Sequence, residues 1–366
     1  MDVGIQMVFS SHGWPGISDG QVVDEELRLA RLADDLGFDV VWSVEHHFFD
    51  YSFCPDNAQL LSWVAAATKN VDVGTAAVIL PWNEPLRVAE KIALLDHLAR
   101  GRLRFGIGRG LSRREFAAFR GIAMDESRER FDEAAEMILE ALRTGFIEGN
   151  GKFYPQPRAE IRPRPSRSFA DRLYAVASSD DSIESAARIK ATMVMFADRS
   201  WDHRMPSIER HRTRFQELHG VAAPPPLTCD YCVVAPTTDE AKDLATRHMG
   251  TYLESVLEHY EVMGSHFATT KGYGAYAAAS EVLRRIGESG FLKGFMQASA
   301  WGTPDDVLRT LEARRALLGP FELATSFRYG GMPFDKVERS LRLFAKEVLP
   351  VLKTWDVAAT KRVAAA

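Results

Sequence analysis

Three polar residues stand together after a short apolar run: Glu45, His46 and His47 follow residues 39–43, which have the composition of a buried strand. The unperturbed pKa of histidine is about 6.5, so this side chain exchanges a proton at neutral pH. We therefore predict general acid–base catalysis for this group, with a hydrogen-bonded structural histidine as the alternative. Adjacent residues at a strand end point apart, and no third ligand follows at helical spacing, so we expect no metal site here.

A second candidate is Arg109, which follows the run 103–108, where apolar residues alternate with others. Gly108 and Gly110 flank it and let the backbone come close to a ligand. The fork of N–H donors on a guanidinium suits a phosphate, and the alternative is a surface arginine in a strand-to-helix loop. The segment fits a dinucleotide fingerprint poorly, because Leu111 stands where the third glycine belongs.

A third group lies farther along the chain, where Ser178, Ser179 and Ser182 follow the apolar run 173–177 and begin a helical pattern. Hydroxyl groups and free backbone amides at a helix N-terminus bind anions without a metal. Helix capping by a serine is the alternative explanation. Because Arg109 also follows a strand, we expect the arginine and the serines to form one phosphate site.

The elements that must position these groups are eight strands that alternate with helices. This alternation over 366 residues favours a single α/β domain, a (β/α)8 TIM barrel with an insertion after the seventh strand. A doubly wound open sheet is the main alternative, although no dinucleotide fingerprint opens the chain. The strands are expected at 3–9, 39–43, 71–80, 103–108, 173–177, 192–196, a segment ending near 235, and 321–327.

In a parallel barrel the C-terminal ends of all strands meet at one mouth, so the three polar groups should converge there. Residues 264–300 are rich in glycine and show no strand pattern, and we expect them to form a lid above that mouth. We assign 1–355 to the barrel domain and expect 356–366 to be a flexible tail.

Composition excludes several classes of protein. A formal net charge of −5 without a long basic run argues against nucleic-acid binding, and no apolar run is long enough to cross a membrane. The N-terminus lacks the pattern of a secretion signal, and an odd count of three cysteines fits a cytoplasmic protein. Cys229 and Cys232 lack the second pair that a structural zinc site needs, so we expect buried, inert thiols.

Three segments in this order, at 41–48, 73–81 and 101–111, read Val-Trp-x-x-Glu-His-His-Phe, Val-Gly-Thr-Ala-Ala-Val-x-Leu-Pro and Gly-Arg-x-Arg-Phe-Gly-Ile-x-Arg-Gly-Leu. They resemble the bacterial luciferase-like flavin monooxygenases, and most closely the catalytic α subunits of bacterial luciferase. The resemblance extends over nearly the whole chain. It continues through segments at 124–128, 270–273, 302–304 and 343–350.

The resemblance implies a barrel enzyme that binds reduced FMN supplied by a separate NAD(P)H:flavin reductase. In this family the reduced flavin reacts with O2 to give a C4a-peroxyflavin, which oxygenates a hydrophobic small molecule of the carbonyl type. Two alternatives stay open: an F420-dependent oxidoreductase on a related barrel, and a non-catalytic partner subunit. Such a partner would be expected to lack the histidine and the phosphate arginine.

The family pairs through the helices after the second and third strands, here 60–68 and 84–99, so a homodimer is expected. The chain departs from the family at Gly108, where luciferases carry a cysteine close to the flavin, and at Ser178, where the luciferase has a glutamate. The segments 48–57 and 274–300 also diverge. By motif position the resemblance implies that His46 is the catalytic histidine, flanked by Glu45 and His47. It implies that Arg109 binds the flavin phosphate together with a loop that contains Ser178, Ser179 and Ser182. It also implies that Ala76 and Ala77 are joined by a cis peptide bond and support the flavin ring.

Overall fold

A computed structural model describes residues 1–119 and 121–355 of the chain. The expected flexible tail, 356–366, lies outside these residues. Among the residues described, no helix is both long enough and apolar enough to cross a membrane.

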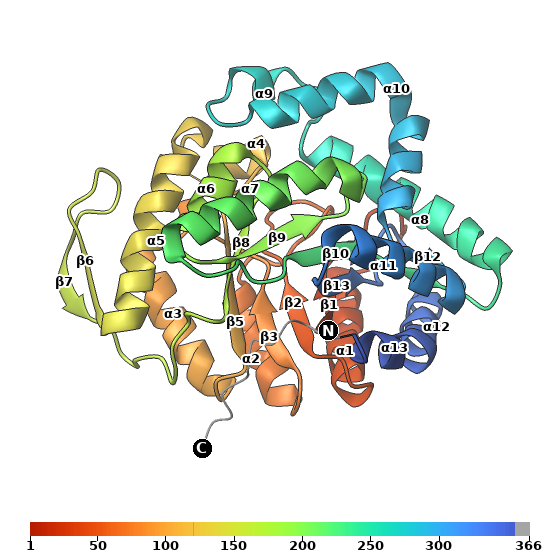
Figure 1. Cartoon of the computed structure of the whole chain (residues 1–366), viewed down its shortest axis with the longest axis horizontal. Helices are drawn as coiled ribbons and strands as arrows, with labels where there is room; N and C mark the ends of the chain where they lie inside the picture. The colour runs from red at the N-terminus through yellow and green to blue at the C-terminus, as the bar shows by residue number, and fades with distance from the viewer. Residues whose placement is uncertain (120, 356–366) are drawn as a thin grey trace.

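The core of the structure is a closed barrel of parallel strands surrounded by helices (Figure 1). β1 pairs with β2 on one side and with β13 on the other, and the pairing of β3 with β5 completes the circle. β3 and β4 together form one strand of the barrel, since both pair with β5, and the barrel therefore has eight strand positions. This confirms the predicted TIM barrel. Its strands are β1 (Val3–Met7), β2 (Val40–Ser43), β3 (Asp72–Thr75), β4 (Val78–Ile79), β5 (Leu103–Gly108), β8 (Leu173–Val176), β9 (Thr192–Phe196), β10 (Leu227–Tyr231) and β13 (Glu322–Ser326).

Helices follow the strands and pack their apolar sides against the barrel. In the first helix, the Ser18 side chain accepts a hydrogen bond from the Gln21 N–H, and apolar residues at helical spacing turn inward. The helices are α1 (Asp19–Asp35), α2 (Asn57–Ala67), α3 (Pro85–Leu98), α4 (Arg113–Ala118), α5 (Ser127–Thr144), α6 (Asp180–Arg188), α7 (Trp201–His219), α8 (Thr238–His259), α11 (Pro304–Leu318), α12 (Phe334–Leu343) and α13 (Leu349–Lys353).

Smaller elements fill the connections. A short antiparallel hairpin projects beside α5, and a two-stranded parallel ribbon lies next to α8. They are β6 (Phe146–Gly149), β7 (Gln156–Glu160), β11 (Val233–Val234), β12 (Trp301–Gly302), the 3-10 turns η1 (Leu80–Trp82) and η2 (Met124–Glu126), and the π-helical turn η3 (Phe344–Val348).

The segment after the seventh barrel strand forms two helices, α9 (His266–Thr269) and α10 (Gly274–Ala298). In Figure 1, α9 and the first part of α10 run along the top above α4, and the second part of α10 turns down on the right toward α11. At Gly287 the backbone has a φ of 70°, which divides α10 into two helical parts that meet at a kink. The insertion that the sequence predicts after the seventh strand is therefore present, and it is helical.

The interior of the barrel is filled by a cluster centred on Trp42. Its ring lies edge-on to Tyr174 at 4.9 Å between centroids. A Cβ atom on Gly74 would lie 2.3 Å from the indole, so only glycine leaves room for Trp42 at this position. Cys229 belongs to the same interior cluster, whereas Cys232 packs in the outer core between strands and helices. Both thiols are free and buried, as predicted.

The N-terminal end of the barrel is closed by charged groups. The Arg104 guanidinium forms ion pairs with Asp2 at 2.6 Å, Asp72 at 2.9 Å and Glu322 at 3.2 Å. The Tyr174 hydroxyl contacts the same arginine at 3.1 Å. These ion pairs close the N-terminal end of the barrel to a ligand, so the open mouth lies at the C-terminal ends of the strands.

A buried carboxyl group on α1 makes the stability of the barrel depend on pH. Glu26 Oε1 accepts a hydrogen bond from the Phe9 N–H at 3.1 Å, and burial raises the pKa of Glu26 to about 7 although Arg328 lies nearby. The folded state therefore holds a proton that the unfolded chain releases above about pH 4.5. The resulting stabilisation is complete at low pH and is lost as the pH rises through about 7.

We therefore expect the free energy of unfolding to fall between pH 5 and pH 8 in part because of Glu26. In Glu26→Gln the neutral amide keeps an acceptor for Phe9, so this decline should become smaller by roughly 1–3 kcal/mol. Urea denaturation of both proteins at several pH values measures the difference. If the free energy of unfolding falls equally with pH in both proteins, the assignment to Glu26 is wrong.

Candidate functional site

A cavity of about 270 Å³ opens at the C-terminal mouth of the barrel. His47 is the single predicted site residue that does not line it. The others meet in this cavity, as expected for residues that follow parallel strands. They are Glu45, His46, Ala76, Ala77, Gly108, Arg109, Ser178, Ser179 and Ser182.

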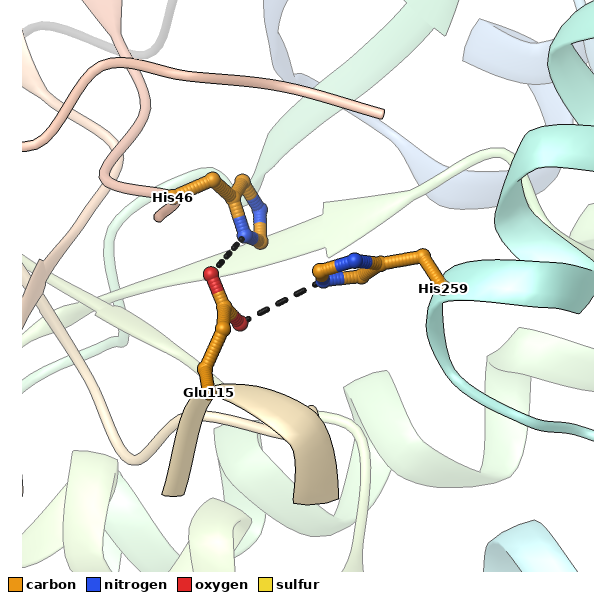
Figure 2. A group of neighbouring side chains, drawn as sticks. All are labelled: His46, Glu115 and His259. Atoms are coloured by element: carbon orange, nitrogen blue, oxygen red, sulfur yellow. Dashed lines mark hydrogen bonds and ion pairs between the residues drawn. The ribbon is translucent and has the colours of Figure 1, made fainter. Parts of the chain in front are cut away.

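The most unusual feature of the mouth is a carboxylate held between two histidines (Figure 2). Glu115, on the short helix α4, contacts His46 Nδ1 through Oε1 at 3.1 Å and His259 Nε2 through Oε2 at 3.3 Å. Oε1 also accepts the backbone N–H of His47 at 2.7 Å. The loop after β2, α4 and the C-terminal end of α8 are thus connected through one side chain.

The charge on Glu115 determines where the histidine protons lie. Burial alone would raise the pKa of this carboxyl group, but His46 and His259 outweigh that effect and lower it to about 2. An ionised carboxylate only accepts hydrogen bonds, so His46 Nδ1 and His259 Nε2 must both carry a hydrogen. Burial lowers the pKa of His259, which is therefore neutral at pH 7. Among the hydrogen bonds of the described residues, the His46 ring takes part only through Nδ1.

Aromatic rings fix the planes of these two imidazoles. The Tyr51 ring stacks on His259 with 4.4 Å between centroids and an interplanar angle of 16°. The same ring meets His46 edge-on at 5.0 Å. Both histidines are therefore oriented by packing as well as by hydrogen bonds, which is the arrangement that a proton-transfer group requires.

Glu45 lines the cavity, whereas the neighbouring His47 does not. Glu45 accepts hydrogen bonds from the Ile79 N–H at 3.0 Å and the Asn83 side-chain amide at 2.9 Å, and it lies 3.4 Å from His47 Nε2. The His47 ring packs against Trp82 and outside the cavity. These contacts hold the turn after β4 against the loop after β2, and a catalytic role for either residue stays a prediction.

His46, Glu115 and His259 also place two imidazole nitrogens and a carboxylate oxygen within 4.8 Å of one another. Such a set resembles a transition-metal site. The sequence argument against a metal, that no third ligand follows at helical spacing, is therefore incomplete because α4 and α8 supply the other two groups. In the structure each of the two ring nitrogens that face Glu115 lies within hydrogen-bonding distance of one carboxylate oxygen.

Two arginines line another part of the cavity. Arg109 donates from Nη2 to the Gly272 carbonyl at 3.1 Å, and its guanidinium lies 4.0 Å above the Tyr273 ring. Gly272 has a φ of 81°, and a Cβ there would lie 2.8 Å from Arg109 Nη1. Arg128 donates to the Ser185 hydroxyl at 3.1 Å.

These arginines retain unused hydrogen-bond donors. Among the residues described, Arg109 Nη1 and Arg128 Nε are buried and have no partner. Burial and the neighbouring positive charge of Arg109 lower the pKa of Arg128 to about 10. Arg128 Nη1 also lies 3.7 Å from Asp132 Oδ1, whereas an anion beside the two unpaired N–H groups would satisfy both donors and offset the repulsion between the arginines.

The serine loop caps a helix. Ser182 Oγ accepts the backbone N–H of Ser178 at 2.9 Å and that of Ser179 at 2.8 Å, in the first turn of α6. The capping explanation is therefore correct for this loop. All three serines also line the cavity, and their binding of a phosphate stays a prediction.

Small residues form one wall of the cavity. The peptide bond between Ala76 and Ala77 is cis, as the sequence resemblance implied, and Asn57 donates to the Ala77 carbonyl at 3.1 Å. A Cβ on Gly108 would lie 3.0 Å from Ile79 Cδ1 and 3.4 Å from the Ala77 side chain. This wall is apolar and has no long side chains, so it suits a flat ring.

Several site residues were not predicted from the sequence: Glu115, Arg128, His259 and the tyrosines beside His46. A local signal existed for one of them, since Ser112 and Glu115 have the spacing of a helix cap and the Ser112 hydroxyl accepts the Glu115 N–H. That signal predicts where α4 begins. It does not show that the Glu115 carboxylate turns toward two histidines.

Comparisons with known proteins agree with this geometry. A family model described as luciferase-like monooxygenase matches residues 1–319. The alkanal monooxygenase alpha chain of Photorhabdus luminescens is 25% identical, and the match covers 93% of this chain and 94% of that protein.

Two solved structures share the fold over nearly their whole lengths. Monooxygenase RslO1 from Streptomyces bottropensis has a TM-score of 0.81 and 28% identity, covering 96% of this chain and 100% of that one. The oxygenating constituent of 3,6-diketocamphane monooxygenase from Pseudomonas putida, a type II Baeyer–Villiger enzyme in complex with FMN, has a TM-score of 0.71 and 20% identity, covering 96% and 98%.

Proposed function

The chain belongs to the luciferase-like monooxygenases and is a flavin-dependent monooxygenase, and on that premise we propose a two-component enzyme. It would receive reduced FMN from a separate NAD(P)H:flavin reductase and use O2 to oxygenate a hydrophobic carbonyl compound. The observation that carries this proposal is the pair of buried, unpartnered donors on Arg109 and Arg128 in the same cavity as His46.

The cavity offers FMN a place for each of its parts. Arg109 Nη1 and Arg128 Nε would donate to the phosphate, and the wall formed by Ala76, Ala77 and Gly108 would face the flat ring. FMN, when bound in its reduced form, supplies the electrons that activate O2. The chain itself shows no dinucleotide fingerprint, which supports reduction by a separate protein.

His46 is the residue to which we assign proton transfer. Glu115 accepts the hydrogen on Nδ1, so the proton to be exchanged with a substrate is held or released at Nε2. When Nε2 is protonated, the adjacent carboxylate stabilises the resulting imidazolium. We assign positioning roles to Glu45 and His47, which hold the neighbouring turn. The presence of both His46 and Arg109 argues against a non-catalytic partner subunit.

The first experiment tests the cofactor. Arg109→Ala should weaken binding of reduced FMN by roughly 1.5–3 kcal/mol, the range for a hydrogen bond to a charged group. Reduced riboflavin, which lacks the phosphate, should bind almost unchanged. An anaerobic fluorescence titration measures both affinities.

Arg113→Ala is the matched control for this titration, because it removes an exposed arginine on α4 that pairs with Glu261 outside the cavity. Equal losses for FMN and riboflavin would mean that Arg109 supports the structure only. Tighter binding of reduced F420 than of reduced FMN would replace FMN by F420 in the proposal.

The second experiment tests catalysis. His46→Asn should lower oxygenation turnover by about a hundredfold to ten-thousandfold, the contribution of a positioned acid–base group. Its affinity for reduced FMN should stay within a few fold of the original. Single-turnover product yield with a reductase, NADH, FMN and a panel of carbonyl compounds gives the measurement.

His47→Asn provides the comparison, since that ring lies outside the cavity and should affect mainly stability. Normal product yield in His46→Asn combined with loss of yield in His47→Asn would show that the roles are reversed. If neither change lowers the yield, the acid–base proposal is wrong.

We also propose a homodimer that forms through α2 and α3. These neighbouring helices expose Trp63, Leu94 and Leu98, with 36%, 49% and 50% of their surfaces accessible. Ala66 and Ala67 are exposed on α2 and would allow a second helix to come close. Exposed large apolar side chains on adjacent helices are typical of an interface between subunits.

Light scattering tests the assembly. At micromolar concentration the protein should have twice the 40.9 kDa mass of the chain, and Leu98→Glu should shift it to the monomer because burying a charge in an apolar interface is unfavourable. Leu218→Glu, at an equally apolar exposed position on α7, should leave the dimer intact. A monomeric unsubstituted protein would contradict the proposal.

A further inference from the structure

Four tyrosine hydroxyls form one hydrogen-bonded row in the wall of the cavity. Tyr231, at the end of β10, donates to Tyr252 on α8. The Tyr252 and Tyr51 hydroxyls lie 3.1 Å apart, and Tyr260 donates to Tyr51 at 3.3 Å. All four rings line the cavity, and Tyr51 is also the ring that packs against His46. The mechanism proposed above does not use these hydroxyl groups.

The row contains one hydroxyl hydrogen more than the number of its hydrogen bonds. Each hydroxyl group has one hydrogen to donate, and four hydroxyls joined by three hydrogen bonds leave one hydrogen without an acceptor. Tyr231 and Tyr260 donate within the row, so the remaining hydrogen belongs to Tyr51 or Tyr252. Among the hydrogen bonds of the described residues, neither has another acceptor. An acceptor atom on a ligand would complete the row.

The tyrosines are donors in their neutral form. Burial raises the pKa of Tyr51 and raises those of Tyr231, Tyr252 and Tyr260 well above the ordinary value. None of them ionises near neutral pH. The row therefore keeps a hydrogen to donate to an oxygen acceptor such as a carbonyl group.

The surroundings of the row are aromatic. Phe295, on α10, packs against the Tyr231 ring with 5.2 Å between centroids. Phe291, Phe267 and Tyr276 line the same cavity from the insertion. Flat rings pack against such walls in offset or edge-on contacts and lose little conformational freedom, whereas a flexible alkyl chain must be ordered at an entropic cost.

We propose that this part of the cavity binds an aromatic ketone, whose carbonyl oxygen accepts the remaining hydrogen of the Tyr51–Tyr252 pair while its rings contact the aromatic walls. The assignment rests on the proposed function, because it names the class of carbonyl substrate for the same site. The hydrogen bond would polarise the carbonyl group and hold it beside His46, whose ring lies 5.0 Å from that of Tyr51. Tyr51 and Tyr252 are then specificity-determining residues.

Three probes separate the contributions to binding. 2-Acetonaphthone has the rings and the carbonyl, 2-ethylnaphthalene has the rings alone, and dodecan-2-one has the carbonyl on a flexible chain with the same number of carbon atoms. Equilibrium dialysis against the flavin-free protein measures each dissociation constant. We expect 2-acetonaphthone to bind about threefold to tenfold more tightly than 2-ethylnaphthalene, as one hydrogen bond allows, and more tightly than dodecan-2-one.

The fourfold variant in which Tyr51, Tyr231, Tyr252 and Tyr260 are each changed to Phe removes every hydroxyl of the row and keeps all four rings, so no freed Tyr231 or Tyr260 hydroxyl can replace the lost donor. It should abolish the preference for 2-acetonaphthone over 2-ethylnaphthalene, and an unchanged affinity for the hydrocarbon shows that the pocket is still folded. Tyr329→Phe is the matched control. Tyr329 packs against Tyr231 and Tyr252, but its hydroxyl is outside the row and the residue does not line the cavity. This control should keep the preference.

Equal affinities of the unsubstituted protein for 2-acetonaphthone and 2-ethylnaphthalene would overturn the proposal, whatever the variants do. A preference that persists in the fourfold variant would also overturn it, as would tighter binding of dodecan-2-one. Binding is measured without flavin and O2, so the result does not depend on turnover. If the protein binds the ketone as expected but forms no oxygenated product, only the proposed function is overturned. If it oxygenates other carbonyl compounds but fails the binding test, only this assignment is overturned.

Discussion

The arrangement of the mouth depends on the buried charge of Glu115. Its two oxygens accept hydrogen bonds from the His46 ring, the His47 backbone and the His259 ring, which belong to two segments far apart in the chain. Each donor left without a partner in such a buried place would cost about 1–3 kcal/mol. The carboxylate therefore fixes the loop after β2, the helix that carries Glu115 and the end of α8 relative to one another.

This local constraint works because the barrel brings the three segments to the same end. Arg104 and its carboxylate partners close the opposite end, and the Trp42 cluster fills the middle. Polar side chains that follow the strands are left at the C-terminal mouth. There they share a cavity with charged groups at Arg109 and Arg128 and neutral donors at the tyrosine row.

The sequence predicts those parts of the structure that depend on residues close together in the chain. Arg109 directly follows an alternating apolar run, and the structure places it at the C-terminal end of β5 as expected. Glu115 and His259 have no such pattern, because they lie 69 and 144 positions from their partners and meet through the packing of α4 and α8. The sequence also did not predict a helix at 274–298, because glycines disfavour helix formation. One of these glycines, Gly287, does interrupt the helix.

The insertion after the seventh barrel strand supplies side chains to both parts of the cavity. Gly272 and Tyr273 contact Arg109, whereas Phe295 packs against Tyr231 in the tyrosine row. One continuous segment therefore contacts the arginine that would bind a phosphate and the aromatic wall that would bind a substrate. Moving this segment away from the barrel would break both sets of contacts together. A displacement of 272–298 as one body is consequently expected to affect both parts of the cavity at once, whereas a single substitution in one part need not affect the other.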